Sequence, residues 1–335
     1  MNTWKQATAS FYVVAAIFGL SQPPAPKTIP PSPGKLVELG GHRLHVSCTG
    51  KGAFTVVVEN GLGDFSFDWI LVQQRVEKFT RICTYDRGGY AWSDPGPKPR
   101  TYAQLNLELH DALNKLGEHH PLILVGHSFG GGVVRNYATT YPSEVAGMVL
   151  VDIVQEDQRI SMGPNKTGLV RDYAKGVPIP KPHENMLSSD KPNLSAASSP
   201  PGEIEPPYDH LPQRQQRLHV WAEQLPAMND AEDSQRDWSA EYMQHLHENP
   251  QQGFLGAIPL IVLTRTEDGF TKDIDLPATE LEANRLQSQS RLVLLSSNGK
   301  QVMVHSGHNM HLEAPDAVTD AIRSVILAAN QSPTK

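Results

Sequence analysis

The feature that most constrains this 335-residue chain is a glycine-flanked serine that directly follows an apolar run. The segment LILVGHSFGGG, residues 122–132, places Ser128 between Gly126 and Gly130. A strand that turns sharply into a helix strains the corner residue, and side chains two positions away on either side would collide there. Glycine removes the collision and leaves the serine hydroxyl exposed. The pattern is typical of a nucleophile elbow, although a serine that only caps a helix gives a similar short motif.

The segments around this motif alternate between strand and helix patterns. Apolar runs typical of buried strands occupy four stretches: 54–61, 81–86, 122–126 and 147–152. Helical periodicity fills the gaps between them, and Gly117 lies where the helix over 101–117 needs a C-terminal cap. This alternation predicts an α/β fold with a mostly parallel sheet and helices on both faces.

The regular alternation of strand and helix patterns stops after Asp152 and resumes at residue 258. We therefore expect one core, residues 36–152 and 258–330, interrupted by a cap or lid at 153–257. A structureless loop of that length is improbable in a compact domain, so the cap should have helices of its own. Helical patterns at 213–225 and 237–249 fit that expectation. Four of their large side chains suit an apolar acyl pocket or the cap's own core: Trp221, Trp238, Tyr242 and Met243.

The N-terminus differs from the rest of the chain. Residues 11–20 are continuously apolar, too short for a spanning helix but suited to the h-region of a secretory signal. Cleavage near Ser21 would release a secreted or periplasmic protein without a membrane span; an uncleaved anchor is the alternative. Residues 22–35 are proline-rich and predict an extended tether outside the folded core.

Composition excludes some partners. The formal net charge is −7, from 29 Lys and Arg against 36 Asp and Glu, and no dense basic run is present. We therefore expect no nucleic-acid partner. No Cys/His cluster or dinucleotide motif indicates a cofactor or metal. The sequence does not specify an oligomeric state.

A nucleophilic serine needs a base, and one loop holds three candidates. The segment HSGHNMHLEAP, residues 305–315, follows the last expected strand and carries His305, His308 and His311. Parallel strands end at one edge of a sheet, so this loop can reach Ser128. His308 follows a glycine at the apex and is the preferred base; His305 is expected to belong to the strand and His311 to begin the last helix.

The base in turn needs a carboxylate that fixes its tautomer. Asp152 ends the strand MVLVD, and Asp268 follows the strand over 258–264. Either side chain could instead be a turn or solvated residue. An oxyanion would need N–H donors, which we expect from the backbone of Phe129 at the helix start and of Leu62 in the loop after VVVENG.

With these pieces in order, the chain resembles an α/β-hydrolase from about residue 36 to 330. The matching motifs are ENGLG (59–63), YDRGGYAWSD (85–94), GHSFGG (126–131), LVD (150–152) and GHNMHLEAP (307–315). The resemblance implies an eight-stranded sheet with a helical cap between strands six and seven. It also implies Ser128 as nucleophile, His308 as base, and the N–H groups of Leu62 and Phe129 as the oxyanion hole.

The chain departs from this family pattern at two positions. Asn60 stands where many relatives carry histidine, and Arg265 stands where strand seven usually has a glycine shortly before its acid. Exported bacterial relatives that the chain resembles often use the aspartate at the end of strand six. We therefore favour Asp152 as the acid and keep Asp268 as the alternative.

The resemblance also bears on the two cysteines. The family's strand order places strand two, with Cys48, beside strand four, with Cys83. Two cysteines in an exported protein are more often paired than free, so a disulfide between them is expected, with two small buried thiols as the alternative.

These predictions favour a serine hydrolase that cleaves small-molecule carboxylic esters through an acyl-enzyme. Epoxide hydrolases and dehalogenases of this fold attack with aspartate, and position 128 is serine. Two alternatives remain open: an amide or peptide hydrolase resembling iminopeptidases, and a non-catalytic protein of the same fold that binds a ligand or partner. The sequence does not specify the acyl size.

Overall fold

The structure is a computed structural model that describes residues 29–119, 121–161, 166–183, 204–267 and 278–331. Within these residues it has an eight-stranded sheet and a separate two-stranded one. In spatial order the eight strands are β1 (Lys35–Glu38), β2 (Arg43–Thr49), β4 (Arg81–Asp86), β3 (Thr55–Glu59), β5 (Leu122–His127), β6 (Val145–Val151), β9 (Leu260–Arg265) and β10 (Gly299–Val304). β1 and β2 pair antiparallel, as do β2 and β4; all other neighbours are parallel. The chain therefore has the predicted α/β-hydrolase sheet.

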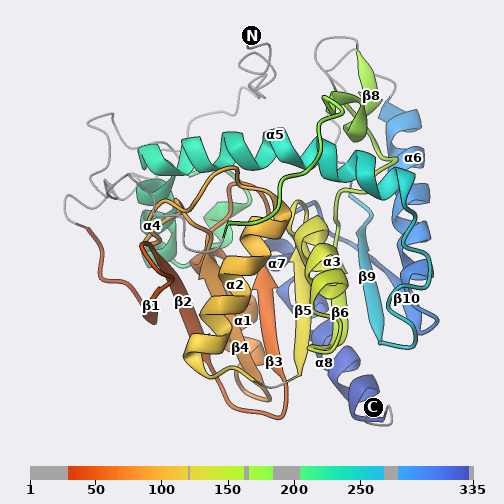
Figure 1. The fold of residues 1–335 in the computed structure, drawn as a ribbon. Coiled ribbons are helices and arrows are strands. Elements are labelled where there is room, and N and C mark those ends of the chain that lie inside the picture. The colour runs from red at the N-terminus through yellow and green to blue at the C-terminus, as the bar shows by residue number, and fades with distance from the viewer. Residues whose placement is uncertain (1–28, 120, 162–165, 184–203, 268–277, 332–335) are drawn as a thin grey trace, which may run out of the picture.

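Helices cover both faces of this sheet (Figure 1). On one face lie α2 (Tyr102–Leu116), α3 (Gly130–Thr140) and the 3-10 helix η5 (Leu292–Leu295). On the other lie α1 (Ile70–Val76) and α8 (Pro315–Gln331). Each face packs as its own apolar cluster, and the central strand β5 is buried along its whole length. Burial on both faces explains why the central strands read as continuous apolar runs.

Local sequence signals set several helix ends. The Thr101 side chain accepts a hydrogen bond from the Gln104 N–H at 3.1 Å and caps the start of α2. Gly117 ends the same helix with a φ of 76°, in the left-handed region. The remaining helices of the core are the short η2 (Ser66–Trp69), α6 (Ala278–Arg291) and α7 (Met310–Glu313).

The insertion between β6 and β9 carries its own small elements. It contains the hairpin β7 (Arg159–Ser161) and β8 (Thr167–Leu169), the 3-10 helices η3 (Val170–Tyr173) and η4 (Tyr208–His210), and the helices α4 (Gln213–Glu223) and α5 (Pro226–Glu248). In Figure 1, α5 runs across the end of the sheet where the parallel strands finish. α5 begins at Pro226, eleven residues earlier than its amphipathic pattern predicted, because proline is well suited to the first turn of a helix.

The proline-rich segment before β1 departs from the sequence prediction. Residues 1–28, which include the expected signal and most of the tether, lie outside the described residues. Residues 29–34, however, pack on the core: the Trp92 indole donates to the Pro30 carbonyl at 2.8 Å, and His45 Nε2 contacts the Pro33 carbonyl. The prediction of a tether outside the core was therefore wrong for these residues, since their carbonyls satisfy buried donors.

The antiparallel side of the sheet holds the predicted disulfide. Cys48 of β2 and Cys83 of β4 are register partners, and their sulfur atoms are bonded. Glu118 lies close to the two cysteines, and this is the sole cluster of three potential metal ligands among the described residues. The disulfide already occupies both thiols.

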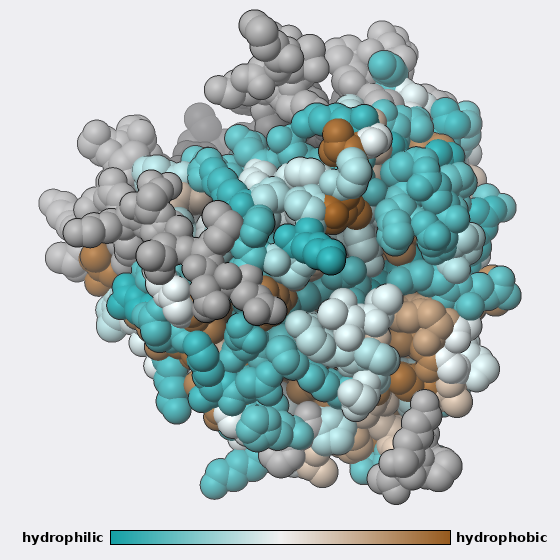
Figure 2. Space-filling model, in the orientation of Figure 1, coloured by the Kyte–Doolittle hydropathy of each residue, from teal (hydrophilic) through white to brown (hydrophobic). Residues whose placement is uncertain are grey.

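The surface is mixed in polarity (Figure 2). Hydrophobic side chains gather on the side of β9 and β10, where Leu294, Val302 and Met303 are exposed. No helix within the described part of the chain is long and apolar enough to cross a membrane.

Candidate active site

Ser128 occupies a strained corner between β5 and α3. Its φ is 51°, in the left-handed region that disfavours residues other than glycine. A Cβ on Gly126 would lie 2.7 Å from Val134 Cγ2, and one on Gly130 would lie 2.4 Å from the Glu59 carbonyl oxygen. Both glycines are therefore required by close packing around the turn, as the elbow pattern predicted. Ser128 itself is only half-buried.

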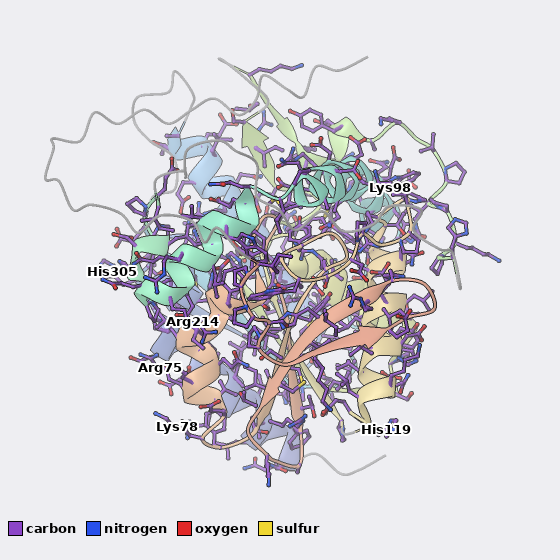
Figure 3. All side chains as sticks on the ribbon, turned by 90° about the vertical axis from the view of Figure 1, so that its left-hand side faces the viewer. Arg75, Lys78, Lys98, His119, Arg214 and His305 are labelled. Atoms are coloured by element: carbon purple, nitrogen blue, oxygen red, sulfur yellow. A yellow bond between two sulfur atoms is a disulfide. The ribbon has the colours of Figure 1, made fainter. Side chains whose placement is uncertain are left out.

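The three candidate histidines have different environments. His305 lies at the periphery, with 91% of its side chain exposed and Nδ1 2.6 Å from Glu267 (Figure 3). His311 is buried and stacks on Trp69 at 4.7 Å; among the described residues neither of its ring nitrogens has a hydrogen-bond partner. Burial lowers the pKa of His311 to about 3. His308 is half-buried and contacts a carboxylate.

That carboxylate belongs to Asp152. His308 Nδ1 lies 2.7 Å from Asp152 Oδ2, although 156 residues separate them. A neutral imidazole that donates from Nδ1 has an unprotonated Nε2, which is the state that a general base requires. Asp152 has a φ of 40°, the same unusual backbone region as Ser128. The alternative acid, Asp268, lies outside the described residues.

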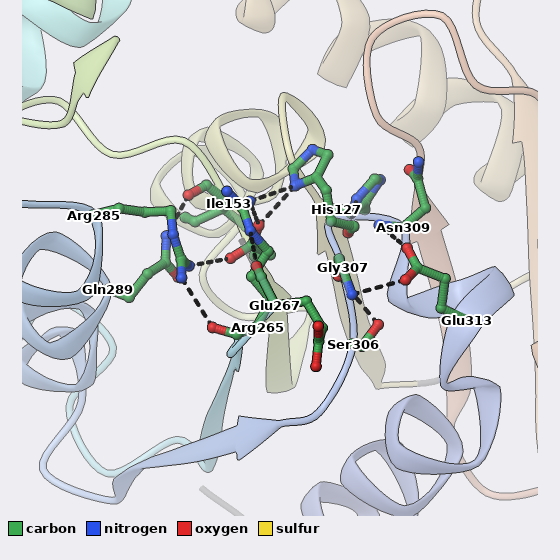
Figure 4. Close-up of polar contacts among 12 residues, drawn as sticks. His127, Ile153, Arg265, Glu267, Arg285, Gln289, Ser306, Gly307, Asn309 and Glu313 are labelled. Carbon is green, nitrogen blue, oxygen red and sulfur yellow. Dashed lines mark hydrogen bonds and ion pairs between the residues drawn. The ribbon is translucent and has the colours of Figure 1, made fainter. Parts of the chain in front are cut away.

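Two arginines contact the same carboxylate. Arg265 Nη1 lies 2.5 Å from Asp152 Oδ2, and Arg285 Nη1 lies 2.9 Å from Oδ1. Figure 4 shows Arg285 on one side of this group of residues and Gly307 on the other. Burial opposes ionisation of Asp152, but the hydrogen bond from His308 and the two arginine charges outweigh it and hold the carboxyl pKa well below its usual range.

Backbone contacts place Ser128 beside both partners. The Ser128 N–H donates to the Val151 carbonyl at 3.2 Å, one residue before Asp152. The preceding residue, His127, places Nε2 3.0 Å from the His308 carbonyl, with the two rings 4.7 Å apart. Among the described residues no hydrogen bond joins the Ser128 hydroxyl to His308. Such bonds are often long without substrate, so this geometry is compatible with a nucleophile and its base.

The loop that carries Leu62, the first predicted oxyanion donor, packs against the start of α3. Leu62 packs against the apolar cluster that contains Phe129, so the loop after β3 faces the start of α3. No acceptor among the described residues bonds to the N–H of Leu62 or Phe129. Two N–H groups at a helix start and an adjoining loop suit a developing negative charge.

Arg87 holds the loop that carries Leu62. Its buried guanidinium donates to the carbonyls of Asn60 at 2.8 Å and Gly61 at 2.6 Å, and to Glu59 Oε1 at 2.8 Å. Its Cζ also lies 5.1 Å from the centre of the Phe129 ring. One side chain thus contacts the segments that contain both candidate oxyanion donors.

Asp64 links this loop to the elbow and to the cap. Its Oδ2 accepts from the Gly61 N–H and lies 3.1 Å from His127 Nδ1, while its Oδ1 accepts from the Tyr208 hydroxyl at 2.6 Å. The Tyr208 ring stacks on His219 of α4 at 4.0 Å. The cap is therefore connected through Asp64 to His127, the residue before Ser128.

The same part of the cap contains a buried ion pair. His219 Nδ1 lies 3.0 Å from Asp68 Oδ1. Burial lowers the pKa of His219, but the charge of Asp68 outweighs this and raises it to about 10. Burial raises the pKa of Asp68 to about 6. A charged pair at this position fixes α4 against η2, which directly precedes α1.

A cavity of about 590 Å³ lies between the start of α2, residues 176–182 and α5, and none of Ser128, Asp152 and His308 lines it. Trp238 and Tyr242 line it, as does Tyr102, whose ring packs edge-on against Phe129 at 4.9 Å. The other two aromatic or apolar cap residues singled out from the sequence have packing roles: Trp221 is buried among aromatic residues of the core loops, and Met243 packs in the Phe129 cluster.

Sequence reasoning missed most of the residues that hold this site in place. Arg265 stands where a glycine is usual in the family, but its charge alone indicates no partner in the sequence. Arg285, Arg87 and Asp64 gave no local signal, because each contacts residues far away in the chain.

Comparisons with known proteins agree with the fold. A sequence profile of the α/β hydrolase fold matches residues 55–183. The chain is 31% identical over 129 residues to a probable transporter, efuK, of Hormonema carpetanum, covering 36% of this chain and 18% of the relative. It is 26% identical over 212 residues to protein phosphatase methylesterase 1 of Candida albicans, covering 62% and 49%. The chain thus spans less than half the length of these curated relatives.

A solved structure is similar over nearly its full length. The thermophilic esterase from Thermogutta terrifontis, with malate bound, superposes with a TM-score of 0.59 at 18% identity, covering 88% of this chain and 99% of the esterase. Sequence identity at this level supports a shared fold and no more. With the strand order, the elbow and the matched profile, the conclusion is that the chain has the α/β-hydrolase fold.

Proposed function

We propose that the protein is a serine hydrolase that cleaves small-molecule carboxylic esters through an acyl-enzyme. The observation that carries this proposal is the arrangement of a strained, half-buried Ser128 next to the His308–Asp152 pair. The esterase activity of the methylesterase relative supports the choice of bond, as does the esterase with the same fold.

In the proposed reaction His308 removes the hydroxyl proton of Ser128 while the serine oxygen attacks the ester carbonyl carbon. The N–H groups of Leu62 and Phe129 stabilise the oxyanion. His308 then gives the proton to the departing alcohol, and an acyl-enzyme forms. Water attacks the acyl carbon, transfers a proton to His308, and the acid leaves as Ser128 recovers its proton. Asp152 keeps the His308 proton on Nδ1 throughout.

We further propose that the protein works in an oxidising compartment after export. The disulfide between Cys48 and Cys83 supports this location, because such bonds are rare in the reducing cytosol. Mass spectrometry of the N-terminus of protein expressed with its leader would test cleavage near Ser21. Retention of residues 1–20 in the mature protein would contradict it.

The nucleophile can be tested with a fluorophosphonate probe, which labels activated serines. The wild-type protein should be labelled, and Ser128→Ala should lose labelling and lower kcat for p-nitrophenyl esters by roughly 10⁴-fold or more. The matched control is Ser290→Ala, because Ser290 is an exposed serine of α6 and should label like wild type. Equal labelling of Ser128→Ala and wild type would contradict the proposal.

The same preparation distinguishes the bond type. We expect kcat/KM for p-nitrophenyl esters to exceed that for aminoacyl anilides, and a series of rising chain length to give the acyl size. Higher kcat/KM for the anilides would replace the ester assignment by a peptidase one. Absence of both labelling and turnover would favour the non-catalytic alternative.

A further inference from the structure

Two buried arginines contact the carboxylate beside His308, and they come from different elements. Arg265 is the last residue of β9, the strand next to β6 in the sheet. Arg285 lies on α6 and is almost completely buried. A hydrogen bond also joins α6 to β9, because the Arg285 guanidinium donates to the backbone carbonyl of Arg265 at 2.9 Å.

The two arginines do not have equivalent roles. Arg285 bonds Oδ1 of Asp152 and pairs with Glu282, so its charge is shared between two carboxylates. Arg265 bonds Oδ2, the oxygen that also faces His308. Apart from its contact with the His308 ring, the other described polar contact of its side chain is with the Glu267 carbonyl at 3.3 Å, which is uncharged. The Arg265 guanidinium therefore lies next to the hydrogen bond between Asp152 and His308.

Arg265 also lies close to the imidazole itself. Its Nη1 is 3.4 Å from His308 Nδ1. The other groups around His308 are Asp152, which attracts a proton to the ring, and His127, whose ring is 4.7 Å away. Behind His127 lie Asp64, paired with it, and His311, whose ring is 4.9 Å from it. A proton on both nitrogens of His308 would add a positive charge next to Arg265.

On these contacts, and resting on the proposed function, we propose that Arg265 is a positioning residue. It holds the Asp152 carboxylate for His308, and its charge beside the ring extends the activity of the enzyme into mildly acidic solution. Burial lowers the pKa of His308; Asp152 opposes this effect, and the charges of His127 and Arg265 add to it. A general base with a lowered pKa stays unprotonated further into acid.

The direct test is the titration of His308, followed by NMR of histidines labelled at Cε1 in the full-length protein. The spectrum of His308→Gln assigns the signal. In Arg265→Gln the midpoint of the His308 titration should rise by about one pH unit, because a positive charge beside the ring is lost. In Arg265→Lys, which keeps the charge, the midpoint should stay closer to the wild-type value.

Two further variants complete the test. Arg285→Gln should raise the midpoint of the His308 titration by less than Arg265→Gln does, because Arg285 bonds the Asp152 oxygen that does not face the ring. If Arg265→Gln does not fold, Arg285→Gln still tests whether a positive charge at Asp152 lowers that midpoint. Arg291→Gln is the matched control, because Arg291 is half-exposed on α6 and its one ion pair among the described residues is with Asp157 at 3.9 Å. An unchanged or lowered midpoint in both Arg265→Gln and Arg285→Gln would overturn the inference.

Kinetics separate this inference from the proposed function. If the protein hydrolyses esters, the acid limb of kcat/KM against pH should move upward with the NMR midpoint in Arg265→Gln. A lower kcat with an unmoved acid limb would reduce Arg265 to a structural residue and overturn its effect on the base. If wild-type protein neither labels nor turns over, the proposed function fails, while the NMR shift still reports whether Arg265 sets the ionisation of His308.

Discussion

Arg87 shows how much a single buried side chain can contribute to a site that it does not enter. Its planar guanidinium reaches two carbonyls of the loop after β3 and one carboxylate oxygen of Glu59. A lysine has the same charge but a single donor centre, so it cannot make these three contacts together. These three contacts hold the loop that carries Leu62, so the position of the Leu62 N–H group depends on the Arg87 guanidinium.

We therefore expect Arg87→Lys to lower the free energy of unfolding by about 2–4 kcal/mol, because at least one carbonyl and part of the buried Glu59 carboxylate lose a charged hydrogen bond. The kcat for ester hydrolysis should fall about tenfold, since one oxyanion donor becomes less well placed. Urea denaturation and steady-state kinetics measure the two effects.

Arg43→Lys is the control for this change. Arg43 also pairs with a carboxylate, Asp94, but its side chain is 42% exposed, so its loss of stability should stay below about 1 kcal/mol. Equal losses in the two variants would show that the loop carbonyls do not depend on Arg87.

At the scale of elements, the ends of neighbouring strands determine which acid serves the base. β6 and β9 are adjacent and parallel, and the Asp152 N–H donates to the Leu263 carbonyl at 2.9 Å. Asp152 thus lies at the end of β6 and within reach of the histidine loop that follows β10. That loop is held by Glu313, which accepts from the N–H groups of Gly307 and Asn309 at 2.8 and 3.2 Å (Figure 4).

The comparison of two aspartate variants tests this assignment. Asp152→Asn should lower kcat/KM for esters by roughly 10³–10⁴-fold, because an amide no longer fixes the His308 tautomer. Asp268→Asn should stay close to wild type. The opposite ranking would transfer the acid role to Asp268, the candidate that follows β9.

Sequence patterns predicted the elements of the core better than those of the cap. Continuous apolar runs marked β3 to β6, and Thr101 and Gly117 marked the ends of α2 through local capping. The β7–β8 hairpin has three residues in each strand, too few for a periodic signal. The contact of Arg285 with Asp152 spans 133 residues, so no local pattern could reveal it.

At the scale of the whole molecule, the disulfide ties the antiparallel side of the sheet to its parallel centre. It joins residues that are 35 positions apart and spans β3 and α1. Closing a loop of this length restricts the unfolded chain.

Replacing both cysteines, Cys48→Ala with Cys83→Ala, should lower the free energy of unfolding by about 4 kcal/mol through that loss of restriction. Urea denaturation measures the change, and reduction of the wild-type protein should bring its stability close to that of the variant. Reductant should leave the variant itself unaffected. A wild-type stability that does not respond to reductant would argue against a stabilising role for this bond.

The contact between Tyr208 and Asp64 has a consequence for access to Ser128. Any outward swing of the cap removes a hydrogen bond from a carboxylate that also holds the Gly61 N–H and His127. We therefore expect opening of the cap to weaken the hold on the loop that carries Leu62. In the proposed enzyme the oxyanion donors would then be best placed while the cap keeps its bond to Asp64.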